Sequence, residues 1–95
     1  MNIQQATASY FLDKPVMKVY LFGSYARNEA NAESDIDLLL DIDYSKAPVD
    51  LLDLYQWTED LQVILKTKVD LIPSDGLSPF IAPFVESDKL LIYAK

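Results

Sequence analysis

The chain has 95 residues, of which about half are apolar, and 8 basic against 15 acidic residues give a net charge of −7. This length suits one domain spanning residues 1–95, because two halves would each be too small to hold a core unaided. The sequence contains no cysteine and no histidine, which excludes disulfide bridges, zinc–thiolate sites and histidine-based acid–base chemistry. Any metal that the side chains bind is therefore held by oxygen, which indicates Mg²⁺, Mn²⁺ or Ca²⁺.

Charge and hydropathy also limit the environment and the partners. Phosphate contacts need clustered Lys and Arg, so an acidic chain predicts no direct binding to nucleic acid. Residues 1–14 lack the basic start and continuous apolar run of a signal peptide. No apolar stretch approaches the roughly eighteen residues that a membrane span needs. We therefore expect a cytoplasmic protein without membrane contact.

The N-terminal third predicts a helix followed by a buried strand. Apolar residues at helical spacing favour a helix over Asn2–Leu12, and Pro15 ends it. The next segment, Val16–Phe22, is β-branched and aromatic with almost no polar break, which is typical of a central strand. Gly23-Ser24 ends that strand, and the stretch 25–31 is compatible with one or two helical turns.

The middle of the chain predicts a strand, a helix and a second strand. Apolar and acidic residues alternate in Asp35–Ile42, so its even-numbered apolar side chains share one face. Pro48 is suited to the first position of a helix, and the apolar rhythm then continues to Leu65, with Trp57 on the core side. A short strand is expected at Lys68–Pro73, followed by a turn.

The C-terminal segment is less clearly patterned. Ser78-Pro79 resembles a helix N-cap followed by proline at the first helical position, and Pro83 is expected to kink or shorten that helix. Leu90–Tyr93 fits either a final short strand or the end of the helix. The order of elements predicts a small α/β or α+β domain built around three or four strands.

The strongest chemical signal lies between the first two strands. Gly23 and Ser24 end one strand, and after ten intervening residues Asp35 and Asp37 occupy alternate positions on the next. Glycine lets backbone approach an anion closely, and serine offers a hydroxyl and an amide to phosphate. Two carboxylates on one strand face repel each other unless a cation lies between them, and Mg²⁺ prefers carboxylates together with substrate phosphates. The pattern predicts metal-dependent phosphoryl or nucleotidyl transfer.

Each of these residues also has an ordinary structural explanation. Asp35 and Asp37 fit the solvated face of an edge strand, Gly23-Ser24 fits a turn, and Arg27 fits a solvated loop position. The joint spacing argues against coincidence. With this chain's own residue frequencies, G-S-x10-D-x-D arises by chance in about one such chain in several hundred.

Asp70 is the candidate for a third carboxylate. It lies between Val69 and Leu71 in an otherwise apolar strand and faces the opposite way to both. A charge in the middle of a small sheet is costly unless it is paired or metal-bound, which favours a position in the same pocket. The alternative is a strand-end charge paired with Lys18 or Lys68.

The run G-S-Y-A-R-x7-D-I-D-L-L-L resembles the signature of the polymerase-beta-like nucleotidyltransferase superfamily, and the length is similar to its minimal nucleotidyltransferase (MNT) family. The resemblance is strong over Val16–Ile42 and looser over the strand at 69–72 and the C-terminal L-L-I-Y. It implies an α/β (α+β) nucleotidyltransferase core, with a three- to four-stranded mixed sheet flanked by helices. It also implies that Gly23, Ser24 and Arg27 bind the nucleotide, and that Asp35, Asp37 and Asp70 are catalytic and metal-binding.

The same resemblance implies a reaction and a partner. Minimal proteins of this kind are similar to the antitoxin of MNT–HEPN toxin–antitoxin pairs, which transfers AMP from ATP to a tyrosine hydroxyl of a helical HEPN ribonuclease. We therefore expect an enzyme using ATP and two Mg²⁺ ions, in a hetero-oligomer with such a toxin. Asp70 is expected to be the third ligand or the base. Two alternatives stay open: transfer to a small-molecule acceptor, and an antitoxin that neutralises by binding only.

Overall fold

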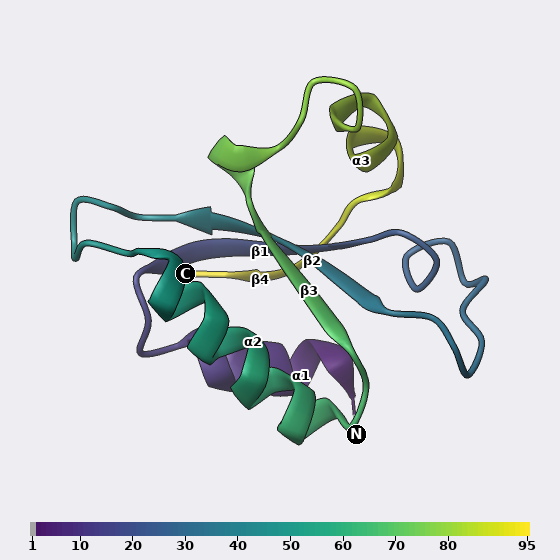
Figure 1. Ribbon diagram of the computed structural model, residues 1–95, viewed down its shortest axis with the longest axis horizontal. Coiled ribbons are helices and arrows are strands. Elements are labelled where there is room, and N and C mark those ends of the chain that lie inside the picture. The colour runs from purple at the N-terminus through teal and green to yellow at the C-terminus, as the bar shows by residue number, and fades with distance from the viewer. Residues whose placement is uncertain (1) are drawn as a thin grey trace.

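Four strands form one mixed sheet in the order β3-β2-β1-β4 in the computed structural model, which describes residues 2–95 (Figure 1). β1 runs antiparallel to both β2 and β4, whereas β2 and β3 are parallel and are connected through α2. This arrangement agrees with the predicted α/β fold around three or four strands. The elements are α1 Ile3–Phe11, β1 Val16–Phe22, β2 Ile36–Ile42, α2 Leu51–Leu65, β3 Val69–Pro73, the 3-10 turn η1 Ser74–Gly76, α3 Ala82–Asp88 and β4 Leu90–Ala94.

The two faces of the sheet have different coverings. Helices α1 and α2 lie together on one face, and α3 lies on the other (Figure 1). As predicted, the even-numbered apolar side chains of β2 enter the main core under α1 and α2, where Trp57 and Leu61 of α2 are also buried. On the opposite face, Leu39 packs with Phe22 and with Val85 of α3. The alternation of β2 therefore directs Asp37 to the face that carries α3.

Helix α2 begins later than the sequence predicted. Its N-cap is Asp50 rather than a residue before Pro48, because the Asp50 carboxylate accepts the Asp53 amide at 3.0 Å and the Asp53 carboxylate accepts the Asp50 amide at 3.0 Å. This reciprocal capping satisfies two backbone donors at once, which a proline start does not do. Helix α1 agrees with the prediction, with Asn2 as its N-cap.

The segment after β1 forms a hydrogen-bonded turn over residues 24–28 and does not continue as a helix to 31. The amides of Ala26 and Arg27 both donate to the Gly23 carbonyl, so one turn forms. Asn28 then adopts a left-handed φ of 59°, which ends it. β2 begins at Ile36, one residue after the predicted start.

In the C-terminal segment, helix α3 begins later than predicted, and the final residues, which fitted either a strand or a helix end, form a strand. Ser78 closes a turn in which its carbonyl accepts the amides of Ile81 and Ala82, and α3 begins only at Ala82. Pro83 therefore lies in the first helical turn, where its missing N–H is not needed, and the helix is shorter than one that starts at Pro79, in agreement with the expected shortening. The final segment is a strand, β4, which pairs antiparallel with β1. None of the helices within residues 2–95 has the length and apolarity needed to cross a membrane.

Candidate active site

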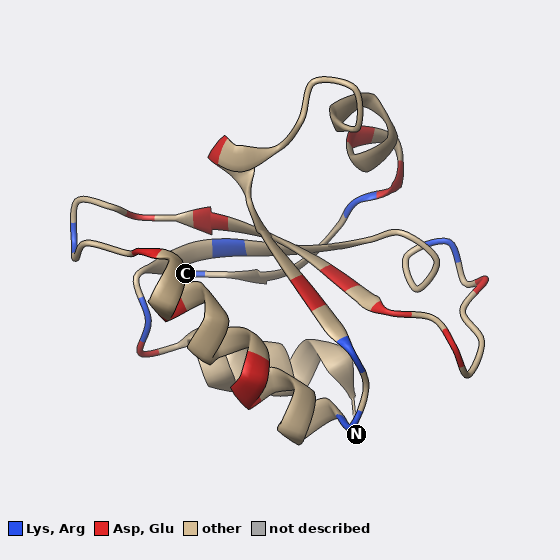
Figure 2. Cartoon of the chain, viewed as in Figure 1, with Lys and Arg blue, Asp and Glu red and all other residues tan. Residues whose placement is uncertain are grey.

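The predicted aspartates converge at one end of the sheet. Antiparallel pairing of β1 and β2 places Phe22 opposite Asp37, so Gly23 follows directly beside it. Parallel pairing of β2 and β3 places Asp70 opposite Asp37. Asp35 lies two residues before Asp37, immediately ahead of β2. Acidic bands consequently occupy neighbouring ends of β2 and β3 (Figure 2).

Gly23 is required at its position for two separate reasons. Its φ of +77° lies in the left-handed region that side chains disfavour. A Cβ atom built on it would lie 2.3 Å from Oδ2 of Asp37, well inside contact distance. The glycine therefore leaves the space that the Asp37 carboxylate occupies. Of the chain's two glycines, only this one is confined in this way, since a Cβ on Gly76 would meet nothing within 4 Å.

Ser24 lies in the turn that follows, half-buried, and its carbonyl accepts the Glu29 amide at 2.9 Å. This turn fixes the backbone of the predicted phosphate-binding residues beside the aspartates. With a single turn rather than a helix after it, close approach of the backbone at Gly23 and the Ser24 hydroxyl are the features offered to an anion.

The charges at this end of the sheet repel one another. Burial raises the pKa of the Asp37 carboxyl above its ordinary value, and the carboxylates of Asp70 and Asp35 raise it further. The Arg27 guanidinium acts in the opposite direction on the same pKa, but with the smallest effect of the four. Ionised Asp37 is thus unfavourable in the folded protein unless a cation compensates it.

The donor set suits Mg²⁺ but is not a closed cage. Within residues 2–95 no group of three or more acidic side chains is placed as ligands of one metal ion. Mg²⁺ usually takes one or two carboxylates and completes its octahedron with waters and substrate phosphates. Asp35 and Asp37 are half-buried, and Asp70 is exposed. Such an open set suits an ion that arrives bound to a nucleotide.

Arg27 lies in the turn that begins at Gly23, beside Asp37, and its side chain is already engaged. Its Nε donates to Oε2 of Glu29 at 3.2 Å, and its NH1 donates to Oδ2 of Asp88 at 2.5 Å. Sequence reasoning did not find Asp88, because it lies 61 positions away on α3 and no local pattern connects the two. The predicted phosphate contact of Arg27 stays a prediction.

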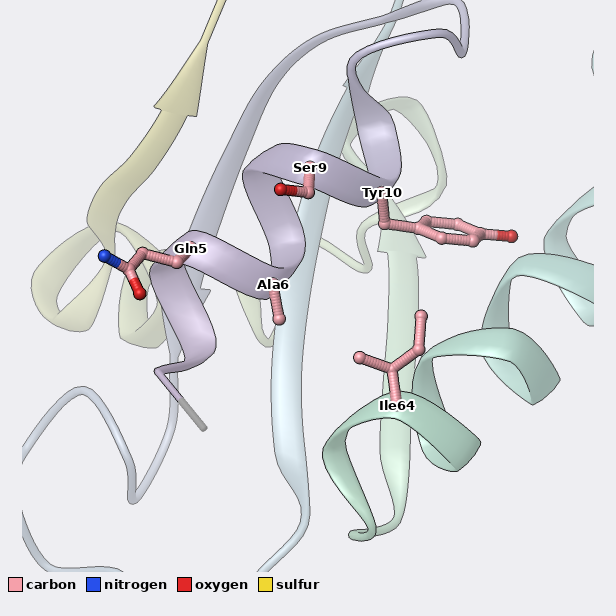
Figure 3. A pocket seen from close by; sticks show the side chains of 5 residues that line it. All are labelled: Gln5, Ala6, Ser9, Tyr10 and Ile64. Carbon is pink, nitrogen blue, oxygen red and sulfur yellow. The ribbon is translucent and has the colours of Figure 1, made fainter.

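A hollow of about 430 Å³ lies between α1 and α2, on the face of the sheet opposite to Asp37 (Figure 3). Its lining is mostly apolar and contains no carboxylate, so it offers no ligands to a metal–nucleotide complex. The Tyr10 hydroxyl points from α1 toward α2, where it donates to Oδ2 of Asp60. The lining residues are Gln5, Ala6, Ser9, Tyr10 and Ile64.

The site combines a glycine fitted against Asp37, a second carboxylate two residues earlier, a third on the neighbouring strand β3 and an arginine in the adjacent turn. In a small α/β fold this set is typical of the phosphoryl-transfer class. Residues 3–92 match the nucleotidyltransferase domain family, which is nearly the whole chain. The chain belongs to this family.

Two curated relatives show how close the similarity is. A protein of Methanocaldococcus jannaschii, provisionally named protein adenylyltransferase MJ0126, is 41% identical over 78 residues, which cover 81% of this chain and 76% of that one. Protein adenylyltransferase MntA of Thermococcus cleftensis is 37% identical over 70 residues, covering 74% of this chain and 68% of its own length.

Solved structures share the fold over almost the whole chain. A toxin–antitoxin crystal structure with AMP-PNP superposes with a TM-score of 0.84 at 20% identity, covering 99% of this chain and 75% of that one. A complex of tri-AMPylated Shewanella oneidensis HEPN toxin with its MNT antitoxin gives a TM-score of 0.67 at 19% identity, covering 98% and 74%. At these identities the likeness establishes the fold.

Proposed function

We propose that this protein is a Mg²⁺-dependent protein adenylyltransferase that transfers AMP from ATP to a hydroxyl, expected to be a tyrosine, of a HEPN-type toxin in the cytoplasm. The observation that carries the proposal is the fit of Gly23 against Asp37, with Asp35 and Asp70 on the adjoining chain segments. A surface cluster of acids has no reason to require a glycine in the left-handed region beside it.

The proposed roles follow the positions of the side chains. Asp35 and Asp37 would hold Mg²⁺, which supplies charge neutralisation at the triphosphate when bound. The backbone at Gly23 and the hydroxyl of Ser24 would receive the triphosphate. The acceptor hydroxyl oxygen forms the new bond to the α-phosphorus, the bond to the β,γ-pyrophosphate breaks, and Asp70 accepts the hydroxyl proton. Its exposure on an edge strand leaves Asp70 within reach of an incoming hydroxyl.

The partner is proposed from the relatives. Proteins at 37–41% identity carry the name protein adenylyltransferase, and structures of the same fold contain a HEPN toxin. A protein acceptor also suits the openness of the site, because Asp70 is exposed at the sheet edge. We expect a hetero-oligomer in which the toxin presents its hydroxyl at this edge.

The test is label transfer from α-labelled ATP to the neighbouring gene product in the presence of Mg²⁺. Wild type should label that protein, and Asp35→Asn/Asp37→Asn should not. Asp41→Asn is the matched control, because Asp41 lies on the same strand and face but opposite Lys18 of β1 in the strand register, at the far end from the site. We expect this control to label at the wild-type rate.

Three results would contradict the proposal. Equal labelling by wild type and the double variant would show that the aspartates are not the site. Transfer to a small alcohol without any partner would establish the small-molecule alternative. Full protection of cells from the toxin by an Asp35/Asp37/Asp70→Ala triple variant would establish neutralisation by binding alone.

A further inference from the structure

The Arg27–Asp88 ion pair connects two distant parts of the fold. Of the four ion pairs within residues 2–95, the other three join residues at most three positions apart. This one joins the loop after β1 to the last residue of α3 at 2.5 Å. It is the contact that ties the chain's single arginine to a rigid element rather than to its own loop.

Asp88 is held firmly enough to position its partner. Its side chain is 19% exposed, whereas that of Arg27 is 44% exposed. Helix α3 is anchored to the sheet by Val85, which is buried against Phe22 and Leu39. The next residue, Lys89, places its ammonium 4.5 Å from the centre of the Tyr20 ring on β1. Contacts on both sides of Asp88 therefore hold the end of α3 that carries it on the sheet.

The bound guanidinium retains donors that neither ion pair uses. Arginine has five N–H donors in a planar fork, and Glu29 and Asp88 take one from Nε and one from NH1. The NH2 group is not used by either contact. The Arg27 amide donates to the Gly23 carbonyl at 3.1 Å, so the arginine extends from the same turn that lies beside Asp37. A planar cation held in this way can offer its remaining edge to a phosphate beside Asp37.

We propose that Asp88 is a positioning residue that holds Arg27 in the orientation needed to bind the ATP triphosphate. This inference rests on the proposed nucleotidyltransferase activity and assigns a function to α3 within it. Asp88 touches neither the reacting atoms nor the nucleotide; it acts through the arginine. The opposite mechanism, in which Asp88 competes with phosphate for Arg27, predicts tighter nucleotide binding when Asp88 is removed.

The sign of the change in nucleotide affinity distinguishes the two mechanisms. In label-transfer kinetics, Asp88→Asn should raise the KM for ATP about three- to tenfold and change kcat less than about twofold. Asp88→Glu, which keeps the charge, should restore most of the affinity. Glu86→Gln is the matched control. It removes a carboxylate from the same helix, and the ion-pair partner of that carboxylate is Lys89 rather than Arg27. It should leave KM unchanged.

A double-mutant cycle separates positioning from a structural contribution. If Asp88 acts through Arg27, Asp88→Asn should have no further effect on KM in an Arg27→Gln background. Additive effects, an unchanged KM or a lowered KM would each overturn the proposal. If thermal unfolding shows that Asp88→Asn does not fold, Asp88→Ser is measured in its place. Absence of label transfer by wild type would instead refute the proposed function.

Discussion

Replacing Gly23 with alanine should damage the active site more than it damages the fold. The added Cβ would lie 2.3 Å from Oδ2 of Asp37, whereas ordinary contact begins near 3.4 Å. The carboxylate must therefore retreat by about 1 Å, a misplacement that can cost about 100-fold in rate. The left-handed φ of +77° adds strain of about 1–2 kcal/mol. For a domain of this size, that strain lowers the melting temperature by about 5–15 °C.

The assay compares label transfer and thermal unfolding of Gly23→Ala with those of Gly76→Ala. Gly76 is the chain's other glycine, is exposed, and has open space where a Cβ would be built. Its substitution should leave the rate unchanged and the melting temperature within about 3 °C of wild type, because no strain or clash is introduced. Rates are measured well below the transition of each variant. A Gly23→Ala protein that keeps more than about half of the wild-type rate would refute the proposed confinement of Asp37.

Two further substitutions test the raised pKa values of Asp37 and Tyr10, which lie on opposite faces of the sheet. Asp37→Asn should abolish transfer yet stabilise the metal-free protein at pH 7 in urea unfolding. The folded-state pKa of Asp37 is raised above 3.8, so ionisation of its carboxyl costs the wild type stability as the pH rises through that pKa. The extra stability of Asp37→Asn over wild type should therefore vanish as the pH falls toward 3.8. A variant less stable than wild type at pH 7 would contradict this. Tyr10→Phe should lose about 1 kcal/mol of stability with its hydrogen bond to Asp60 while transfer stays unchanged. Burial and that hydrogen bond raise the folded-state pKa of Tyr10 above 10.0, so the wild type should lose stability above pH 10. Tyr10→Phe should lose less stability over the same range. Urea unfolding at pH 9 and pH 11 measures both losses.

The aspartates could be predicted from sequence because local rules determine where they point. Alternation along β2 sends Asp37 to the face opposite Leu38, and a charge between the buried Val69 and the partly buried Leu71 sends Asp70 to the same face. Pairing of short neighbouring strands then leaves little freedom in how the two carboxylates meet. Gly23 was found in the same way, since it directly follows the strand that pairs with β2.

Features that depend on competing local signals or on distant contacts could not be predicted. At the start of α2, proline at position 48 and the reciprocal cap of Asp50 and Asp53 gave competing signals, and the cap prevailed because it satisfies backbone donors. At α3, Ser78 was predicted to cap the helix, but its carbonyl closes a separate turn first. The contact of Asp88 with Arg27 depends on where α3 packs, which no local pattern encodes.

If the proposed roles hold, the order of these residues across the sheet would place the two substrates on different sides. Asp37 on β2 lies between Gly23, at the end of β1, and Asp70 on β3. Arg27 lies in the turn after β1, and Val85 of α3 packs on Phe22 of β1 and Leu39 of β2. The β3 side ends in an edge strand with Asp70 exposed. With the proposed roles, the triphosphate is therefore held on the covered β1 side, and the acceptor hydroxyl approaches from the open β3 side. On the proposed roles, a protein acceptor approaching from that side would not have to displace α3.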